Sequence, residues 1–387
     1  MFLLEHDAKE LLAARGFPVP PGVLVREAAE VAATELPPGP WVVKAQVPVG
    51  GRGKAGAIQL AATREAVAAQ VGSLTRRRVH GHPVRACRIE QQLHGAQEAY
   101  LGLLVDGASG GVQVLLSAGG GVDVERLQAE QGLLRFRTVT GEPEELLAAV
   151  DELAGAFPES WHAPLREAGR LAAEAFPALD ALLLEINPLF IWPDGRWAAG
   201  DAKLIVDDNA LPRQPAVQRL LEQRPWAYPE TVIKWTEGFD YVDLHPDGEI
   251  GLVSTGAGLG MMVVDELEAQ GLKARNFVDI RTGLLRGDPR RLIRVLEWIA
   301  AGPNLRVVLI NVFAGVTHLG EFARLLLEAL DRVPQVKVPV VARLVGTGLD
   351  EARAVLAASP RRIVLTTDLD EAVAMATALA KGVQSPC

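Results

Sequence analysis

The last third of the chain alternates short apolar runs with helical stretches, and this pattern restricts the fold more than any other feature of the sequence. The runs IGLVS, NFVDI, VVLINVF, VPVVARLV and RIVLTT follow one another from Glu249 onward, and a segment of helical periodicity comes after each of them. Strands that are apolar throughout are buried on both faces, and a strand–helix–strand order joins parallel strands. The sequence therefore predicts a doubly wound, mainly parallel α/β sheet with helices on both faces.

A proline-rich segment separates this region from the rest of the chain. It breaks the regular pattern at four prolines, Pro212, Pro215, Pro225 and Pro229. A chain of 387 residues is also longer than one hydrophobic core usually supports. We therefore expect one domain over residues 1–230 and a second over residues 240–387.

Composition excludes several classes of protein. A net charge of -9 argues against a nucleic-acid or anionic membrane surface. Cys87 and Cys387 are too few for a disulfide framework and fit a reducing compartment. No run approaches the roughly 18 apolar residues of a membrane span. We expect a cytoplasmic protein with no nucleic-acid or membrane partner, whose anionic substrates require a local cationic site.

A glycine-rich loop follows a predicted strand in WVVKAQVPVGGRGKAG. Glycines let backbone N–H groups close on phosphate oxygens, while Lys44, Arg52 and Lys54 supply positive charge. The loop is not a Walker P-loop, because Ala55 stands where that motif needs a serine or threonine. The sequence favours a phosphate site here, and the alternative is a flexible hairpin tip with solvated charges.

A second polar constellation lies in LLLEINPLFIWPDGRWAAGDAKL. Two strands flank the turn signal Pro193-Asp194-Gly195, and Asn187 and Asp201 each stand seven residues from its centre. Glu185 and Lys203 each stand nine residues away, so all four side chains are expected on one face of the hairpin. Amide and carboxylate oxygens suit Mg²⁺ together with nucleotide phosphates. The alternative is a cross-strand salt bridge on a solvated face.

The segment RIEQQLHGAQEAYLGLLVD places Glu90 at the end of one predicted strand and Glu98 near the start of the next. The ribose hydroxyls and the base amine of a nucleotide need hydrogen-bond acceptors, and a lip between two strands can offer them. Without further information a surface hairpin is the simpler interpretation.

Glycines also fill a strand-to-helix turn in STGAGLGMMVVDEL, which partly matches a dinucleotide-binding fingerprint. Gly256, Gly258 and Gly260 precede a predicted helix, and Asp279 ends the next strand. Met261 stands where the last glycine of the fingerprint belongs. NAD binding therefore remains an alternative for this domain.

The segment NVFAGVTHLGEFARLLLEAL predicts a buried strand and then a helix that begins near Thr317, over about residues 315–330. The N-terminus of a helix suits a phosphoryl or carboxylate group because its N–H groups are unpaired. His318 is either a substrate contact or simply a residue at the helix start.

These motifs resemble, in order and spacing, the β subunit of succinate–CoA ligase, over almost the whole chain. The resemblance implies an N-terminal ATP-grasp domain that binds ATP/ADP or GTP/GDP. It implies a nucleotide site formed by Lys44, Gly51, Arg52, Gly53, Glu90, Leu93 and Glu98, and Mg²⁺ ligands Asn187 and Asp201. It also implies that a small dicarboxylate meets Thr255, Gly315, Val316 and Thr317 near the N-terminus of the "power helix".

The same resemblance implies a division of labour between two chains. In this family a phosphohistidine on a separate α subunit carries the phosphoryl group between two sites, and the α subunit binds CoA. No catalytic residue is therefore expected in this chain. The resemblance implies a heterodimer or heterotetramer that converts succinate, CoA and ATP reversibly into succinyl-CoA, ADP and phosphate, a step of the tricarboxylic acid cycle.

The sequence departs from the family pattern mainly near the expected acid site. Thr255 replaces a usual asparagine, Arg281 and Thr282 lie where glycines are usual, and His318 replaces an arginine. These departures suggest a paralogue that acts on malate or another small carboxylate, or a regulatory subunit without catalytic activity.

Overall fold

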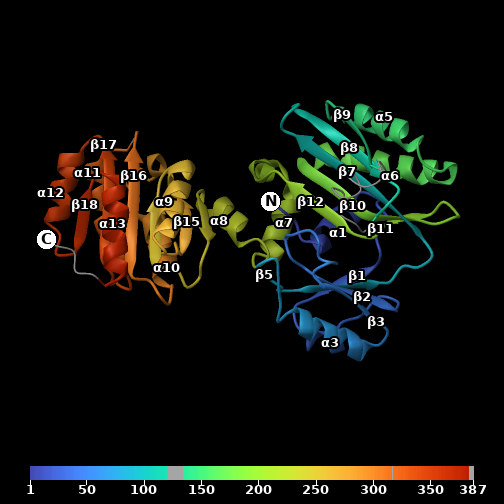
Figure 1. Ribbon diagram of the computed structural model, residues 1–387, viewed down its shortest axis with the longest axis horizontal. Coiled ribbons are helices and arrows are strands. Elements are labelled where there is room, and N and C mark those ends of the chain that lie inside the picture. The colour runs from blue at the N-terminus through green and yellow to red at the C-terminus, as the bar shows by residue number, and fades with distance from the viewer. Residues whose placement is uncertain (121–133, 316, 383–387) are drawn as a thin grey trace. The chain divides into compact units, whose positions relative to one another are not determined.

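A computed structural model describes residues 1–120, 134–315 and 317–382 of the chain. The polypeptide divides into two compact units, Met1–Ala227 and Tyr228–Cys387, and each is described by itself (Figure 1).

The first unit begins with a helix and an antiparallel sheet in the order β1-β6-β2-β3. Helix α3 covers one face of this sheet, below it in Figure 1. The elements of this part are α1 (Glu5–Ala13), β1 (Gly22–Val25), α2 (Glu30–Ala33), β2 (Trp41–Ala45), β3 (Ile58–Ala61), α3 (Arg64–Leu74), the short pair β4 (Arg78–Val79) and β5 (His82–Pro83), and β6 (Cys87–Gln91).

A second antiparallel sheet completes the first unit, in the order β11-β10-β7-β8-β9, with β12 also paired to β10. Helices α5 and α6 lie along it at the top of this unit in Figure 1. Its elements are β7 (Gln97–Asp106), β8 (Gly111–Ser117), β9 (Leu134–Val139), α5 (Pro143–Ala154), α6 (Glu159–Ala178), β10 (Ala181–Ile191), β11 (Trp197–Ala199), β12 (Ala202–Val206), the 3-10 helix η1 (Asp208–Arg213) and α7 (Pro215–Gln223).

The residues of the first sheet alternate between the core and a polar face. Val43 on β2 and Ile89 on β6 pack into the core with α3, whereas Lys44 and Glu90, their neighbours in sequence, point the other way. This alternation directs charged side chains from two adjacent strands into the same cavity.

The second unit contains the predicted parallel sheet, in the order β14-β16-β17-β18. Its elements are α8 (Pro229–Glu237), β13 (Asp240–Asp243), β14 (Ile250–Ser254), α9 (Ala257–Ala269), β15 (Asn276–Asp279), the 3-10 helix η2 (Thr282–Leu284), α10 (Arg290–Ala300), β16 (Val307–Ala314), α11 (Leu319–Arg332), β17 (Val340–Gly346), α12 (Leu349–Ala357), β18 (Ile363–Thr366) and α13 (Leu369–Ala380).

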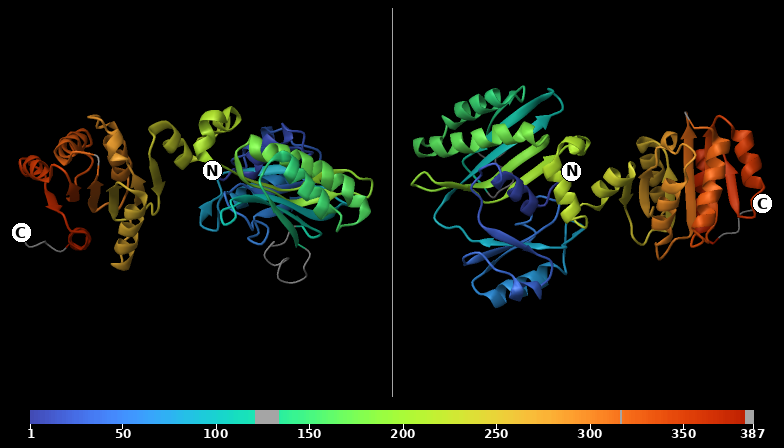
Figure 2. Two further views of the ribbon diagram at one scale, coloured as in Figure 1. Left: turned by 90° about the horizontal axis from the view of Figure 1, so that it is seen from above. Right: turned by 180° about the vertical axis from the view of Figure 1, so that it is seen from behind.

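Helices cover both faces of this sheet, as the sequence predicts (Figure 2). Leu252 and Leu309 pack with α9 and α13, whereas their neighbours Val253 and Ile310 pack with α10 and α11 on the opposite face. The strands are therefore buried on both sides, which explains why their sequences are apolar without alternation.

One predicted strand of this sheet is placed differently. The run NFVDI forms β15, which pairs with β13 in antiparallel fashion rather than extending the parallel ladder. It still lies beside β14, because the buried side-chain amide of Asn276 donates to the Leu252 carbonyl at 2.8 Å and accepts from the Leu252 N–H at 3.0 Å. A side chain therefore replaces part of the backbone ladder, and the apolar pattern does not reveal this.

Among the residues described, no helix is both long enough and apolar enough to cross a membrane.

Candidate nucleotide site

A cavity of about 630 Å³ lies in the first unit, and its walls come from both antiparallel sheets. The structure brings to this one cavity all nine residues that the sequence assigned to nucleotide and Mg²⁺, namely Lys44, Gly51, Arg52, Gly53, Glu90, Leu93, Glu98, Asn187 and Asp201. The residues come from segments as far apart in sequence as β2 and β12. Their convergence is consistent with one ligand site, and their individual roles remain predictions.

The predicted hairpin has the expected register. Glu185 on β10 pairs with Lys203 on β12, and the Asn187 N–H donates to the Asp201 carbonyl at 3.3 Å. All four side chains line the cavity. Opposite β7, the register of β10 shifts between Ile186 and Leu189, and such a bulge changes the direction of the side chains within it. Asn187 lies in this bulge.

The carboxylate of Asp201 already has a cationic partner. One guanidinium nitrogen of Arg52 lies 2.8 Å and 2.6 Å from its two oxygens, and 2.8 Å from a carboxylate oxygen of Glu5. The other terminal nitrogen of Arg52 donates to the carbonyl of Ala45 at 3.1 Å. Arg52 thus ties the glycine loop to the hairpin and is buried, whereas Lys54 of the same loop is exposed.

Lys44 lies among three acceptors on three different segments. Its ammonium group donates to Glu5 at 2.8 Å and to the Gly200 carbonyl at 2.6 Å, and it also pairs with Glu90. Glu5 belongs to α1, Glu90 to β6, and Gly200 directly precedes Asp201. A lysine that faces the cavity is therefore fixed by groups that are almost completely buried.

The electrostatics of the cavity follow from burial and close charges. Burial alone disfavours charged Lys44, but the carboxylates of Glu5, Glu90 and Asp201 outweigh it and raise the pKa of Lys44 above its ordinary value. Burial raises the pKa of Asp201, and Arg52 opposes that rise. The pKa of Arg52 is raised as well, by Asp201 and Glu5 against the effect of burial. Both side chains are therefore cations at neutral pH.

The pKa of Glu185, like that of Asp201, is raised by burial. Lys203 and hydrogen bonds from Asn187 and Tyr100 oppose this rise, because they favour the ionised form. The amide of Asn187 is oriented by this contact with Glu185.

Leu93 and Glu98 lie at the rim of the cavity. Leu93 belongs to the link between β6 and β7, and Glu98 near the start of β7 is exposed and pairs in register with Phe190 of β10. The structure thus places Leu93 and Glu98 on the cavity wall. The contacts of Glu98 and of the backbone near Leu93 with a nucleotide stay a prediction.

The second expected site lies at the carboxyl ends of parallel strands in the other unit. Thr255 follows β14 and Gly315 follows β16, and the Thr255 N–H donates to the Asn311 carbonyl at 3.2 Å. Among the described residues, the buried hydroxyl oxygen of Thr317 has no hydrogen-bond partner. Val316 lies outside the described residues. Helix α11 begins at Leu319, two residues later than predicted, because His318 has an extended backbone and precedes the first turn.

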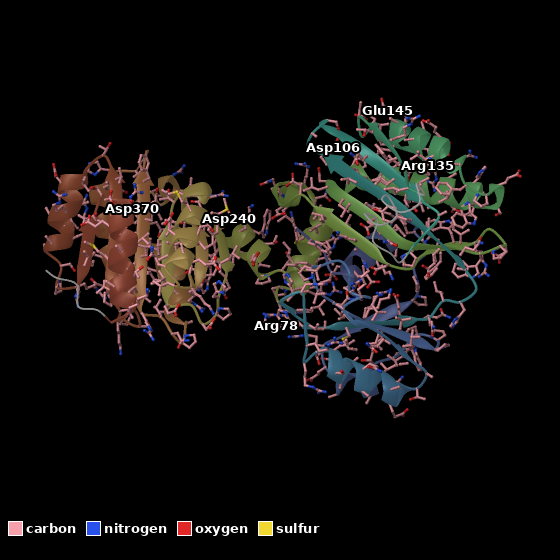
Figure 3. The ribbon with its side chains drawn as sticks, in the orientation of Figure 1. Arg78, Asp106, Arg135, Glu145, Asp240 and Asp370 are labelled. Atoms are coloured by element: carbon pink, nitrogen blue, oxygen red, sulfur yellow. The ribbon has the colours of Figure 1, made fainter. Side chains whose placement is uncertain are left out.

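The residues that differ from the family pattern near the expected acid site contact other residues of the second unit or are buried in it. The Nδ1 atom of His318 lies 3.7 Å from a carboxylate oxygen of Glu351 on α12, and the imidazole ring packs against Gly348. Arg281 donates to Asp240 on β13 at 2.8 Å (Asp240 is labelled in Figure 3), and Thr282 is buried in η2. The carboxylate of Asp279 accepts the N–H groups of Gly256 and Arg281, each at 3.1 Å. Asp279 is therefore engaged by backbone, which disfavours the dinucleotide alternative.

Sequence reasoning missed two residues of the first site, Glu5 and Lys9. Both lie on α1 with 1% and 0% of their side chains exposed, and they form an ion pair of 2.9 Å. The available signal was helical phase, since Glu5 and Lys9 share the face of α1 that also buries Leu12. Two charges on the buried face of a helix indicate a polar interior.

Comparison with known proteins adds to this geometry. The family of ATP-grasp domains matches residues 2–191, and the CoA-ligase family matches residues 253–377. The β subunit of an ADP-forming succinate–CoA ligase from Chloroflexus aggregans is 36% identical over 388 aligned positions that cover 99% of each chain. The chain belongs to the succinate–CoA ligase β-subunit family. The resemblance inferred from the sequence, the fold class and the prediction of a ligase subunit are confirmed at the level of this family.

Other relatives agree with this membership. The β subunit of a GDP-forming succinate–CoA ligase from Thermus thermophilus is 35% identical and matches 93% of this chain and 94% of its own. A solved structure of ATP citrate lyase from Methanothrix soehngenii, in complex with citrate and coenzyme A, has a TM-score of 0.72 at 18% identity and matches 97% of this chain and 98% of its own. At that identity the likeness shows that the fold is shared.

Proposed function

We propose that the chain is the nucleotide-binding β subunit of a cytoplasmic acid–CoA ligase, which joins succinate to CoA with ATP or GTP and works with a separate α subunit. The observation that carries the proposal is the cavity in which Lys44, Arg52, Asn187 and Asp201 meet. Membership of the succinate–CoA ligase β-subunit family supports the reaction class.

In this proposal the cations of the cavity neutralise the phosphates. Lys44 and Arg52 supply fixed positive charge, and the glycine loop supplies backbone N–H groups. Asn187 and Asp201 would hold Mg²⁺, which prefers hard oxygen ligands and would neutralise phosphate oxygens. These residues fit such an ion, because both offer oxygen atoms in the same cavity. Arg52, which contacts both oxygens of Asp201, would have to yield at least one of them to the ion.

The proposed chemistry requires an activated acid, since oxide is a poor leaving group for a thiol. The histidine of the α subunit first takes the γ-phosphoryl group of the nucleotide, and the nucleoside diphosphate leaves. A carboxylate oxygen then attacks this phosphorus, the P–N bond breaks, the imidazole leaves, and an acyl phosphate forms. The CoA thiolate then attacks the acyl carbon, and phosphate leaves with the bonding electrons. Catalysis of such transfers consists mainly of positioning and charge neutralisation. We assign the phosphohistidine and the CoA site to the α subunit, and the N-terminus of α11 to the phosphoryl group after transfer.

Nucleotide binding to the isolated full-length chain tests the first half of the proposal. We expect Mg²⁺-dependent binding of ADP by calorimetry, weakened about 10- to 100-fold by Lys44→Ala because a charge-assisted contact is lost. Asp201→Ala should remove the dependence on Mg²⁺. Lys273→Ala is the matched control, since this exposed lysine lies in the other unit and only approaches Asp247 at 3.8 Å. Equal affinity in the wild type and Lys44→Ala would refute the nucleotide site.

Reconstitution with an α-like chain tests the second half. We expect thioester formation only when both chains are present, and its loss in Lys44→Ala. A regulatory subunit would instead associate with the partner and leave turnover unchanged by this substitution.

The acid site favours a second candidate, a ligase for another small carboxylate. His318 is paired with Glu351 and Arg281 with Asp240, so the residues that replace the family pattern there have partners of their own. Assays of the reconstituted pair with succinate, malate, itaconate and acetate distinguish the candidates. A clear preference for succinate would exclude the second one.

A further inference from the structure

Lys9 is a lysine without solvent contact beside a cavity that the cations Lys44 and Arg52 line. Its side chain is 0% exposed, whereas lysines are rarely buried unless they are paired. Its ammonium group donates to Glu90 at 2.8 Å and 3.1 Å and to the Gly200 carbonyl at 2.8 Å, and it lies 2.9 Å from Glu5. Lys9 does not line the cavity, so direct contact with a ligand does not explain its presence.

Lys9 and Lys44 share the same three acceptors. Both contact the carboxylates of Glu5 and Glu90, and both donate to the carbonyl of Gly200. Two carboxylates and two ammonium groups therefore form a cluster, in which Lys44 lines the ligand cavity and Lys9 lies in the protein interior. Each carboxylate has one further cation, since Arg52 pairs with Glu5 at 2.8 Å and Arg88 pairs with Glu90 at 2.7 Å. The contacts of Lys9 also join α1, β6 and the residue that precedes Asp201.

The cluster has a consequence for ligand binding. A phosphate that draws Lys44 toward itself weakens the contacts of Lys44 with Glu5 and Glu90, whose side chains are 1% and 3% exposed. Water cannot then solvate these carboxylates, and Arg52 and Arg88 each contact only one of them. Two buried negative charges that lose a shared cation are unfavourable. Lys9 keeps its contacts with both carboxylates in either position of Lys44, because it does not face the cavity.

We propose that Lys9 is a positioning residue of the nucleotide site, which keeps Glu5 and Glu90 neutralised and the Gly200–Asp201 segment in place when Lys44 turns to a phosphate. This inference rests on the proposed nucleotide function. In this inference the positive charge of Lys9 contributes to nucleotide affinity, beyond the contribution of its side-chain packing to the fold.

Lys9→Met tests the role, because methionine keeps most of the volume and removes the charge. We expect the dissociation constant for ADP with Mg²⁺, measured by calorimetry on the full-length chain, to rise about 10- to 100-fold. The matched control is Glu10→Gln on the same helix, whose partly exposed carboxylate pairs with Arg224 at 3.1 Å outside the cavity. This control should stay within about twofold of the wild type.

A charge-balanced double variant separates charge from packing. Lys9→Met combined with Glu5→Gln removes one cation and one anion, and we expect it to regain at least about tenfold of the affinity lost in Lys9→Met. Equal affinity of Lys9→Met and the wild type, or no recovery in the double variant, would overturn the proposal. A wild type that fails to bind ADP would instead refute the nucleotide function itself.

Folding of the variants is followed by circular dichroism. If Lys9→Met does not fold, the double variant is compared with Glu5→Gln alone. The proposal then requires their affinities to agree within about threefold, because one remaining carboxylate no longer needs the second lysine. A much weaker double variant would overturn it.

Discussion

At the scale of single residues, the site depends on Glu5, a carboxylate in contact with three cations. Burial raises its pKa, but Lys44, Lys9 and Arg52 outweigh burial and hold the pKa well below the ordinary 4.5. Glu5 belongs to the first helix, and its partners belong to α1, β2 and the glycine loop. One ionised side chain therefore joins several segments around the cavity.

The pH dependence of stability follows from this lowered pKa. A depressed carboxyl pKa stabilises the folded state above the unfolded value of about 4.5, and this contribution disappears as the pH falls through the lower folded value. Glu5→Gln should lower the free energy of unfolding by about 3 kcal/mol at pH 7, because buried cations lose a partner.

Calorimetric unfolding of the wild type and Glu5→Gln between pH 7 and pH 3 provides the measurement. The difference between the thermal unfolding midpoints of the two proteins should narrow progressively below pH 4.5. A difference that stays constant over this range would show that Glu5 acts through packing rather than through its charge.

Much of the site was predictable because charge and spacing are local properties of the sequence. The register of Glu185 with Lys203 follows from the position of the turn, and the cation-rich glycine loop is contiguous. The bonds of Arg52 to Glu5 and Asp201 join residues that are distant in sequence, so no local pattern reveals them. Lys9 pairs with Glu5 on its own helix, which helical phase could have shown, but its contacts with Glu90 and Gly200 join distant segments.

At the scale of elements, the hairpin of β10, β11 and β12 presents Asn187 and Asp201 through a close backbone approach. A Cβ atom at Gly200 would lie 2.4 Å from the Phe190 ring and 2.9 Å from the Pro188 carbonyl, so only glycine fits. The carbonyl of Gly200 also accepts from both Lys9 and Lys44. The position of Asp201 therefore depends on a residue without a side chain.

Gly200→Ala should shift this segment and affect stability and binding together. We expect a loss of about 1–3 kcal/mol in the free energy of unfolding because the site is overpacked. We also expect weaker Mg²⁺-dependent ADP binding by calorimetry. Gly107→Ala is the control, because a Cβ atom there meets no heavy atom within 4 Å. Similar behaviour of the two variants would exclude the role assigned to Gly200.

At the element scale the fold was harder to predict where side chains replace backbone pairing. The apolar run of β15 has the composition of a parallel strand, yet Asn276 holds it to β14 through its amide. The start of α11 also differs from the prediction. There the Leu319 N–H donates to the carbonyl of Thr347, in the loop after β17, at 2.9 Å. Both differences arise from contacts between segments.

At the scale of the whole molecule, the cavity lies entirely within the first compact unit, Met1–Ala227. Its walls come from the two sheets of this unit, from α1 and from connecting loops. The second unit has separate hydrophobic clusters on the two faces of its own sheet. The domain limits at 230 and 240 stay a prediction from the proline pattern.

A fragment of residues 1–227 should therefore fold and bind ADP by itself. We expect a cooperative thermal transition by circular dichroism, because the unit contains its own core. Its affinity for ADP with Mg²⁺ should lie within about threefold of that of the full-length chain. A folded fragment that does not bind ADP would show that residues beyond 227 contribute to the site.

The two ends of the first unit meet in space. The Leu3 N–H donates to the Leu204 carbonyl at 2.9 Å, and Arg224 pairs with Asp7 of α1 at 2.9 Å. During synthesis on the ribosome, the helix that bears Glu5 and Lys9 emerges before these later segments. Its buried charges meet their last partners only when the hairpin and α7 have left the exit tunnel, so the pocket is one of the final parts of the unit to form.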